Sequence, residues 1–252
     1  MGHGSLKQII ERVGASGVPE MEIIKRAGRS GPRLGLFPSS FNPTTVAHVE
    51  LIGRAAREFS LDETLAIAGK ANADKASYDC PLEDRLEMLV STFSGDDRIS
   101  VGLSSHPYFP DMLDALARSY TGDREFYFIV GFDTFERVLD PEDCYRAKYH
   151  RKFDSRRHAL EYLFSKSNFV VAARAGAGLG HTRALIEGEA GLLEGRVHFL
   201  DLPAEIAERS ATEVRHRLRE GLSIIGLVPA EVEQYIDRRG LYKTGGAQGK
   251  SC

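Results

Sequence analysis

The apolar residues of the chain fall into short continuous runs, which alternate with stretches where apolar positions recur every three or four residues. Continuous runs of this length are typical of buried strands, whereas the three-and-four spacing is typical of helices that pack one face on a core. The run at 125–131 is dense in aromatic and β-branched residues and is the strongest strand signal. The pattern predicts strands at 33–37, 64–68, 99–103, 125–131, 168–173 and 197–200, and helices beginning near 45, 81, 112, 181, 210 and 229.

This alternation of strands and helices favours one fold class. Because parallel strands need crossover connections, we expect an α/β protein with a Rossmann-like, doubly wound parallel sheet, right-handed crossovers and helices on both faces. Ligands of such sheets bind beyond the carboxyl ends of the strands. The loops that begin near Phe37, Gly69, Leu103 and Gly131 should therefore share one rim.

Residues 1–32 are predicted to form a helical extension ahead of the main domain. A helix with an apolar face at 6–13 is followed by a second short helix at 21–27, before Gly and Pro residues break the pattern. We expect the extension to pack on the core, with partner binding as the alternative. The main domain then spans 33–242, and the polar tail at 243–252 is predicted to be flexible.

Composition and charge narrow the class of protein. At 252 residues, one α/β domain can bury a full core. With 33 basic and 36 acidic residues the formal net charge is −3, which gives no bulk attraction to nucleic acid or to membranes. No signal peptide or transmembrane segment is predicted. Three cysteines, Cys80, Cys144 and Cys252, lack Cys-x-x-Cys spacing, so we expect no disulfide framework and a reducing, cytoplasmic location.

The stretch from Gly35 to His48 looks like a phosphate-handling turn. A short apolar run ends in a polar loop that contains Ser39 and Ser40, and a helix with an apolar stripe begins near Thr45. His48 falls in the first turn of that helix, where free backbone N–H groups and the helix dipole favour an anion. The arrangement suits nucleotide phosphates.

A second candidate site opens the helix near residue 210. Ser210 with Glu213 three residues later has the spacing of a capping box, and helix capping alone is the simpler interpretation. Capping does not require Thr212 and Arg215, which lie in the first turns beside Ser210. Hydroxyls, backbone N–H groups and a guanidinium together can hold phosphates through charge-assisted hydrogen bonds.

Both stretches resemble signatures of the nicotinate and nicotinamide mononucleotide adenylyltransferases, within the cytidylyltransferase-like nucleotidyltransferase superfamily. The first signature is matched by Gly35, Phe37, Phe41-Asn42-Pro43 and Thr45-Val46-Ala47-His48, with Ala47 in place of a glycine and Thr45 where many members have histidine. The second, Ser-x-Thr-x-x-Arg, is matched by Ser210, Thr212 and Arg215. The resemblance covers roughly residues 33 to 242.

The resemblance implies transfer of AMP from ATP to nicotinamide or nicotinate mononucleotide, with release of pyrophosphate, in NAD biosynthesis. The acceptor phosphate is itself the nucleophile, so catalysis reduces to alignment and charge stabilisation. His48 would contact the transferring group, and Arg215, Ser210 and Thr212 would hold the pyrophosphate. Mg²⁺ would bridge the ATP phosphates with few protein ligands. The predicted substrate-binding residues also include Gly35, Phe37, Ser39, Ser40 and Thr45.

Weaker correspondences lie in the middle of the chain. Lys75 follows the second strand, and Gly131 and Asp133 follow the fourth, where the family has a Gly-x-Asp; Asp133 could instead cap the next turn. The glycine series at 176–180 does not have dinucleotide-binding spacing, and the charged segment at 141–166 is interpreted as a solvated face, with a lid as the alternative. The histidines His106, His150, His158, His181 and His198 have no ligand-like spacing and are predicted to be surface or core residues.

The acceptor is the part of the reaction that the sequence leaves open. After the third strand the chain reads Pro107-Tyr108-Phe109-Pro110, where nicotinate-specific bacterial members have Ser-Tyr-Thr, and the missing hydroxyls argue against selectivity for nicotinate. The run Gly131-Phe-Asp-Thr-Phe, with Val138-Leu-Asp-Pro141, is more similar to nicotinamide mononucleotide adenylyltransferases of fungi and favours nicotinamide mononucleotide. Other phosphate acceptors, with ATP or CTP, remain alternatives because the family varies this half of the site. A nucleotide-binding sensor without turnover is a further alternative. Assembly as a homo-oligomer stays open.

Overall fold

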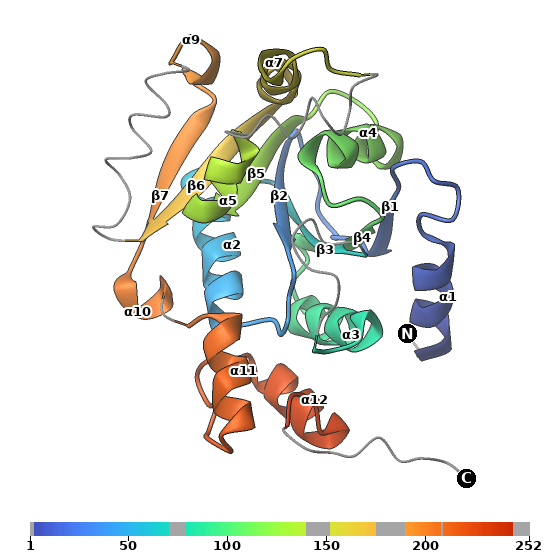
Figure 1. Cartoon of the computed structure of the whole chain (residues 1–252), viewed down its shortest axis with the longest axis vertical. Coiled ribbons are helices and arrows are strands. Elements are labelled where there is room, and N and C mark those ends of the chain that lie inside the picture. Colours follow the sequence, from blue (N-terminus) through green and yellow to red (C-terminus); the bar gives the residue numbers. More distant parts are fainter. Residues whose placement is uncertain (1–2, 71–78, 140–151, 175–189, 208, 244–252) are drawn as a thin grey trace.

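A computed structural model describes residues 3–70, 79–139, 152–174, 190–207 and 209–243 of the chain. Its centre is a sheet in the order β1-β4-β3-β2-β5-β6-β7, in which all pairings are parallel except that of β1 with β4 (Figure 1). The strands are β1 Met21–Lys25, β2 Arg33–Ser39, β3 Glu63–Gly69, β4 Ile99–Ser104, β5 Glu125–Gly131, β6 Ser167–Arg174 and β7 Val197–Leu202. The predicted parallel sheet is confirmed.

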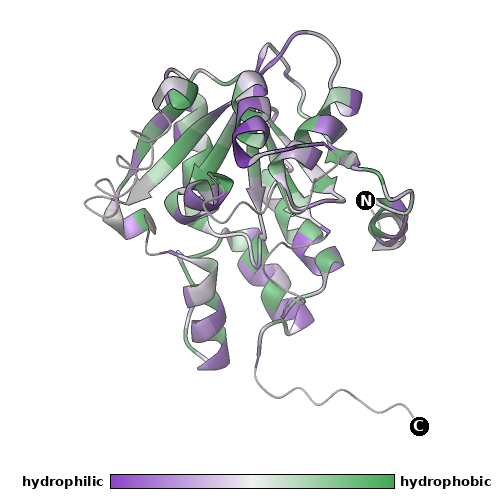
Figure 2. Ribbon diagram, turned by 45° about the horizontal axis from the view of Figure 1, so that its top comes forward, coloured by the Kyte–Doolittle hydropathy of each residue, from purple (hydrophilic) through white to green (hydrophobic). Residues whose placement is uncertain are grey.

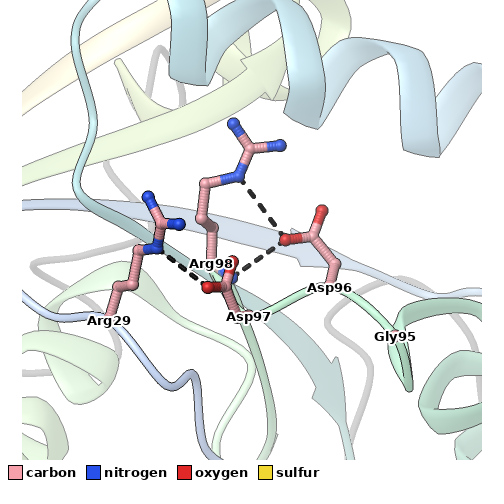
Figure 3. Close-up of a pocket in the computed structure, with 5 residues that line it drawn as sticks. All are labelled: Arg29, Gly95, Asp96, Asp97 and Arg98. Atoms are coloured by element: carbon pink, nitrogen blue, oxygen red, sulfur yellow. Dashed lines mark hydrogen bonds and ion pairs between the residues drawn. The ribbon is translucent and has the colours of Figure 1, made fainter.

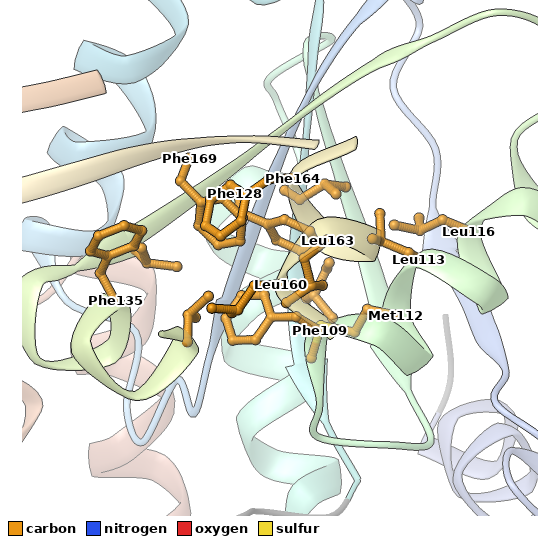
Figure 4. Packing of buried hydrophobic residues seen from close by; sticks show 14 of the residues in the cluster. Phe109, Met112, Leu113, Leu116, Phe128, Phe135, Leu160, Leu163, Phe164 and Phe169 are labelled. Carbon is orange, nitrogen blue, oxygen red and sulfur yellow. The ribbon is translucent and has the colours of Figure 1, made fainter. Parts of the chain in front are cut away.

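Helices cover both faces of this sheet. Side chains alternate across a strand, so Leu34 and Leu36 of β2 join one buried cluster and Phe37 joins another. Figure 4 shows the first cluster, where rings such as Phe128 and Phe169 meet side chains of α4, α5 and α7. The helices are α1 His3–Arg12, α2 Val46–Glu58, α3 Leu82–Phe93, α4 Phe109–Ser119, α5 Phe132–Val138, α7 Arg156–Lys166, α9 Ala190–Leu193, α10 Ala204–Ala207, α11 Ala211–Arg219 and α12 Ala230–Arg239.

Hydropathy follows this layering. Figure 2 shows hydrophobic residues along the central strands and hydrophilic residues on much of the helical surface. Within the described ranges, no helix is long and apolar enough to cross a lipid bilayer. Part of the charged segment at 141–166 is α7, whose Leu160 and Leu163 are fully buried, so its inner face belongs to the core. Residues 140–151 and the glycine series at 176–180 lie outside the described residues.

The N-terminal extension differs from its prediction. Residues 21–27 do not form a helix, because Met21–Lys25 is strand β1 at the edge of the sheet, with Met21 opposite Ser104. The isoleucine pair at 23–24 favours a strand. The unpaired edge of β4 also offers backbone N–H and C=O groups for hydrogen bonds, which a helix of five residues would leave mostly unsatisfied. The first predicted helix is confirmed as α1. The domain boundary at residue 32 stays a prediction, as does the tail at 243–252.

The two last helices pack beside α3. Val214 of α11 and Val232 and Ile236 of α12 join Met88 in a third buried cluster. The carboxylate of Asp84 on α3, which is 3% exposed, accepts hydrogen bonds from Tyr235 at 2.8 Å and Arg239 at 3.1 Å. A buried carboxylate needs such partners, so this contact fixes how α12 docks.

Candidate active site

The carboxyl end of β2 brings a serine and a histidine together. β2 ends at Ser39, the chain turns through residues 40–44, and α2 begins at Val46. Ser39 Oγ lies 3.2 Å from Nε2 of His48, which occupies the first turn of α2 as predicted. Side chains of Phe37 and Phe41 back the imidazole, with ring centroids 5.8 and 5.2 Å away. The apolar backing leaves the Nε2 edge as the polar edge of the ring beside Ser39.

Thr45 determines which nitrogen of His48 carries the hydrogen. Thr45 is the N-cap of α2, and its backbone N–H donates to His48 Nδ1 at 2.9 Å. Because Nδ1 accepts, the hydrogen bond network assigns the hydrogen to Nε2. Burial lowers the pKa of His48 to about 4, so the ring is neutral at pH 7. His48 is therefore a neutral Nε2–H donor, a group that can bond an anionic oxygen.

The start of α11 is the second polar element of the site. Ser210 caps this helix by accepting from Glu213 N at 3.1 Å, as the sequence predicts. Arg215 Nη2 donates to Thr212 Oγ1 at 3.2 Å, so two of the predicted phosphate-binding side chains are in contact. The guanidinium is sheltered, with 12% of the side chain exposed, and its Nε lies 3.4 Å from Asp79. Asp79 also pairs with Arg219 at 2.7 Å.

Asn42 joins the two predicted signatures. Arg215 Nη1 donates to the backbone oxygen of Asn42 at 2.7 Å, across 173 positions of sequence. Tyr242 donates its hydroxyl to Asn42 Oδ1 at 2.8 Å, and Arg85 Nη1 donates to the backbone oxygen of Ser40 at 2.6 Å. These bonds fix the turn between β2 and α2. The loop of the first signature is therefore held by the helix of the second.

Sequence reasoning missed the supporting roles of Asp79, Arg85 and Tyr242. Nothing local in the sequence indicates that Arg85 and Tyr242 contact residues 40–42. Arg85 is only 2% exposed. Arginine is almost never fully buried, so its burial could not be predicted from the residue type. Asp79 carried no signal in the sequence.

Of the predicted residues that remain, the structure describes Gly35, Gly131 and Asp133. Gly35 lies inside β2, where an added Cβ would be 2.8 Å from Leu61 Cδ1, so close packing accounts for it and a substrate role stays a prediction. Gly131 ends β5 on the same rim and is the N-cap of α5. The N-cap alternative for Asp133 is therefore wrong, and this exposed residue lies in the first turn of α5. Lys75 lies outside the described residues.

A hollow of about 420 Å³ lies at the other end of the strands, away from the rim with His48 (Figure 3). It is lined by residues that precede β4 and by Arg29, which precedes β2, so it is at the amino ends of these strands. Its charges are paired, with Arg29 Nε 2.8 Å from Asp97 and Arg98 Nε 3.5 Å from Asp96. The rim with His48, and not this hollow, has the polar groups that point to chemistry.

Comparison with known proteins agrees with this geometry. A family profile described as cytidylyltransferase-like matches residues 36–217. A protein of Geobacter sulfurreducens, described as a probable nicotinate-nucleotide adenylyltransferase, is 30% identical over 235 residues, which cover 85% of this chain and 100% of that protein. One of Saccharopolyspora erythraea with the same description is 29% identical over 217 residues, covering 84% and 90% of the two chains.

Solved structures agree on the fold. The nicotinic acid mononucleotide adenylyltransferase of Plasmodium falciparum complexed with NaAD superposes with a TM-score of 0.61 at 15% identity, covering 84% of this chain and 98% of that one. Its complex with APC gives a TM-score of 0.58 at 16% identity, with the same coverage. The family profile matches more than half of the chain and the solved structures share its fold, so the chain belongs to the cytidylyltransferase-like family.

Proposed function

We propose that this protein is an adenylyltransferase of NAD biosynthesis that transfers AMP from ATP to nicotinate mononucleotide and releases pyrophosphate. The observation that carries the proposal is a neutral Nε2–H donor at His48, at the start of α2, together with Arg215 of α11, which bonds the backbone oxygen of Asn42 in the loop before α2 and also bonds Thr212. The Nε2–H of His48 suits the α-phosphate of a triphosphate, and the guanidinium of Arg215 suits its β- and γ-phosphates.

The reaction needs no nucleophile from the chain. An oxygen of the acceptor phosphate attacks the α-phosphorus of ATP, the new P–O bond forms, and the bond from the α-phosphorus to the bridging oxygen breaks. His48 Nε2–H donates to a non-bridging oxygen on the α-phosphate, where negative charge must be stabilised. Arg215 and Thr212 hold the departing pyrophosphate. Arg215 would exchange its weak contact with Asp79 for phosphate oxygens.

Mg²⁺ fits this arrangement as a companion of ATP. Mg²⁺ prefers oxygen ligands and keeps several waters, and when bound it neutralises phosphate charge. Ser39 and Thr212 would place neutral hydroxyls, and Arg215 a cation, beside the phosphates of bound ATP, and none of these groups is a carboxylate ligand. We infer that phosphate oxygens and water would supply most of the metal's ligands.

The curated relatives favour nicotinate as the acceptor, because their descriptions name nicotinate-nucleotide adenylyltransferases. The segment Pro107–Pro110 lacks the Ser and Thr hydroxyls of the Ser-Tyr-Thr pattern and argues against selectivity for nicotinate. The two acceptors differ at one group, a carboxylate against a carboxamide, so parallel assays separate them.

The test is pyrophosphate release from Mg-ATP with nicotinate mononucleotide and nicotinamide mononucleotide in parallel. We expect release with nicotinate mononucleotide, and its loss in His48→Ala. His198→Ala is the matched control, because His198 lies on β7 against Phe59 and should leave turnover unchanged. ATP binding without release for any phosphate acceptor would overturn the proposal and favour a nucleotide sensor.

A further inference from the structure

Arg215 shares its acidic partner with a second arginine, Arg219, which lies about one turn further along α11. Arg219 Nη2 is 2.7 Å from Oδ2 of Asp79, and Arg215 Nε is 3.4 Å from the same oxygen. Residues four apart lie on one face of a helix, where two like charges repel each other. The Asp79 carboxylate therefore marks a point at which two guanidinium groups stabilise one anionic oxygen.

The geometry of α11 brings both guanidinium groups to the same side of the site. Side chains of a helix lean towards its N-terminus, so Arg219 reaches back over the turn that carries Arg215. Arg215 in turn contacts Thr212 at 3.2 Å and the backbone oxygen of Asn42 at 2.7 Å. The side chain of Arg219 is 45% exposed, against 12% for Arg215, so Arg219 is the more accessible cation of the pair.

The helix dipole alone does not explain the contact of Arg219. Basic residues in the last turn of a helix are favoured by the dipole and can bond nearby carbonyls. Arg217 of the same turn stays local, since its Nε donates to the backbone oxygen of Ser223 at 2.7 Å and its guanidinium lies 3.6 Å from Glu213. Residues two apart point to nearly opposite sides of a helix. Arg219, by contrast, pairs with Asp79, 140 positions earlier in the chain.

We propose that Arg219 is a second phosphate-binding guanidinium that contacts the terminal phosphate of ATP, and that Asp79 is the internal counterion which this phosphate displaces. The inference rests on the proposed function, and on its ATP site in particular. It adds a residue beyond Arg215, where the second signature ends, and beyond residue 217, where the match to the family profile ends.

The order of the groups fits the order of the phosphates. His48 serves the α-phosphate, while Thr212 and Arg215 serve the departing pyrophosphate. Arg219 lies about 6 Å of helix rise beyond Arg215 and is more exposed, which suits the phosphate farthest from the adenosine. The negative charge of a triphosphate exceeds what one Mg²⁺ and one guanidinium neutralise, so a second cation beside it is stabilising. Phosphate oxygens also accept bidentate bonds from guanidinium groups, so they can replace the Asp79 carboxylate.

The experiment compares the binding of ATP and of ADP by titration calorimetry, with Mg²⁺ and without acceptor. ADP lacks the terminal phosphate and is the internal reference. Arg219→Gln should raise Kd for ATP about tenfold, the effect of losing one bond to a charged group, and leave Kd for ADP within about twofold. Arg219→Lys keeps the charge and should recover part of the affinity. Arg217→Gln removes an arginine of the same turn and is the matched control, with both constants unchanged.

Asp79→Asn separates a direct contact from an indirect one. Without the competing carboxylate, the chain should bind ATP about threefold more tightly. If Arg219 acted only by drawing Asp79 away from Arg215, Arg219→Gln would have no effect in the Asp79→Asn background. A direct contact with phosphate predicts that the loss of about tenfold persists there. Thermal unfolding of each variant shows that the proteins compared are folded.

The outcomes distinguish this inference from the proposed function. An unchanged Kd for ATP in Arg219→Gln, an equal rise for ATP and ADP, or loss of the effect in the Asp79→Asn background would overturn the contact with the terminal phosphate. Unchanged or weaker ATP binding by Asp79→Asn would overturn the counterion role of Asp79. Normal ATP binding without pyrophosphate release would overturn the proposed function alone, whereas failure of the unsubstituted chain to bind ATP would overturn both.

Discussion

Replacing His48 by glutamine tests whether its Nε2–H acts as a hydrogen bond donor. A glutamine amide places an N–H near the position of Nε2 but cannot take up a proton, and alanine removes the donor altogether. Loss of one transition-state donor lowers kcat by about 10²–10³-fold, which we expect for His48→Ala. His48→Gln should retain turnover about tenfold above His48→Ala, because the donor persists with less favourable geometry.

Both substitutions should lower stability, and His48→Ala should lower it more, because alanine also loses the packing against Phe37 and Phe41. Each removes the Nδ1 acceptor of the Thr45 N–H, and Thr45 is fully buried. Leaving a buried N–H without its partner costs about 1–3 kcal/mol. For a chain of this size, each kcal/mol lowers Tm by about 2–4 °C, and a stability of about 5–15 kcal/mol keeps both variants folded at 25 °C.

The assay is pyrophosphate release at saturating Mg-ATP and acceptor, with the thermal unfolding of each variant measured in parallel. Unequal turnover in two variants that both stay folded at the assay temperature would separate the donor role from folding. Equal turnover in the two variants, both folded at the assay temperature, would refute the donor assignment. Normal turnover in His48→Ala would remove His48 from the mechanism.

Three further predictions concern pH and the groups around the site. The pKa of His48 is about 4 in the folded chain, against 6.5 for a free imidazole. As pH falls, the unfolded chain therefore binds this proton before the folded chain does. The contribution of His48 to stability is complete above pH 6.5 and decreases as pH falls to about 4. His48 should contribute up to about 1.4 kcal/mol per pH unit to this slope, so denaturant unfolding of His48→Gln should show a correspondingly shallower slope. The same slope in both proteins would contradict the assignment. Asp79→Asn removes the half-exposed carboxylate that competes with phosphate for Arg215, and should lower the inhibition constant of pyrophosphate about two- to fivefold. A higher inhibition constant would show instead that Asp79 orients the guanidinium. Tyr242→Phe removes the hydroxyl that bonds the buried Asn42 Oδ1, and should lower the free energy of unfolding in urea by about 1–3 kcal/mol and also lower kcat. Unchanged stability and unchanged kcat would mean that the loop is held without this hydrogen bond.

The central strands were predictable because each is a complete local signal. β2, β3 and β5 read as apolar runs, and β5 pairs with β2 and β6 at the centre of the sheet. β1 was not predictable in the same way. Its five residues are too few to separate a helical period from a strand period, and its conformation depends on pairing with β4, which lies about 80 positions away in sequence.

The same distinction applies to the site. His48, Ser210 and Thr212 could be found because helix starts have local rules, and both helices begin where the sequence predicts. The tautomer of His48 could not be read from residue spacing, since it follows from the backbone direction at Thr45. The contacts of Arg85 and Tyr242 with residues 40–42 could not be read either, because they join residues 45 and 200 positions apart in the sequence.

The bonds on Asn42 also have a consequence for the order in which the protein matures. Asn42 leaves the ribosome well before Arg215 and Tyr242, which hold its two oxygens and are among the last parts of the described chain to be made. At about 5–20 residues per second, synthesis of the intervening stretch takes on the order of ten to forty seconds. During that time the sheet can assemble from β1 to β7 while the nucleotide loop still lacks its restraints. A nascent chain would therefore become competent for its substrate only once α11 and α12 have emerged, which separates folding of the scaffold from the onset of activity.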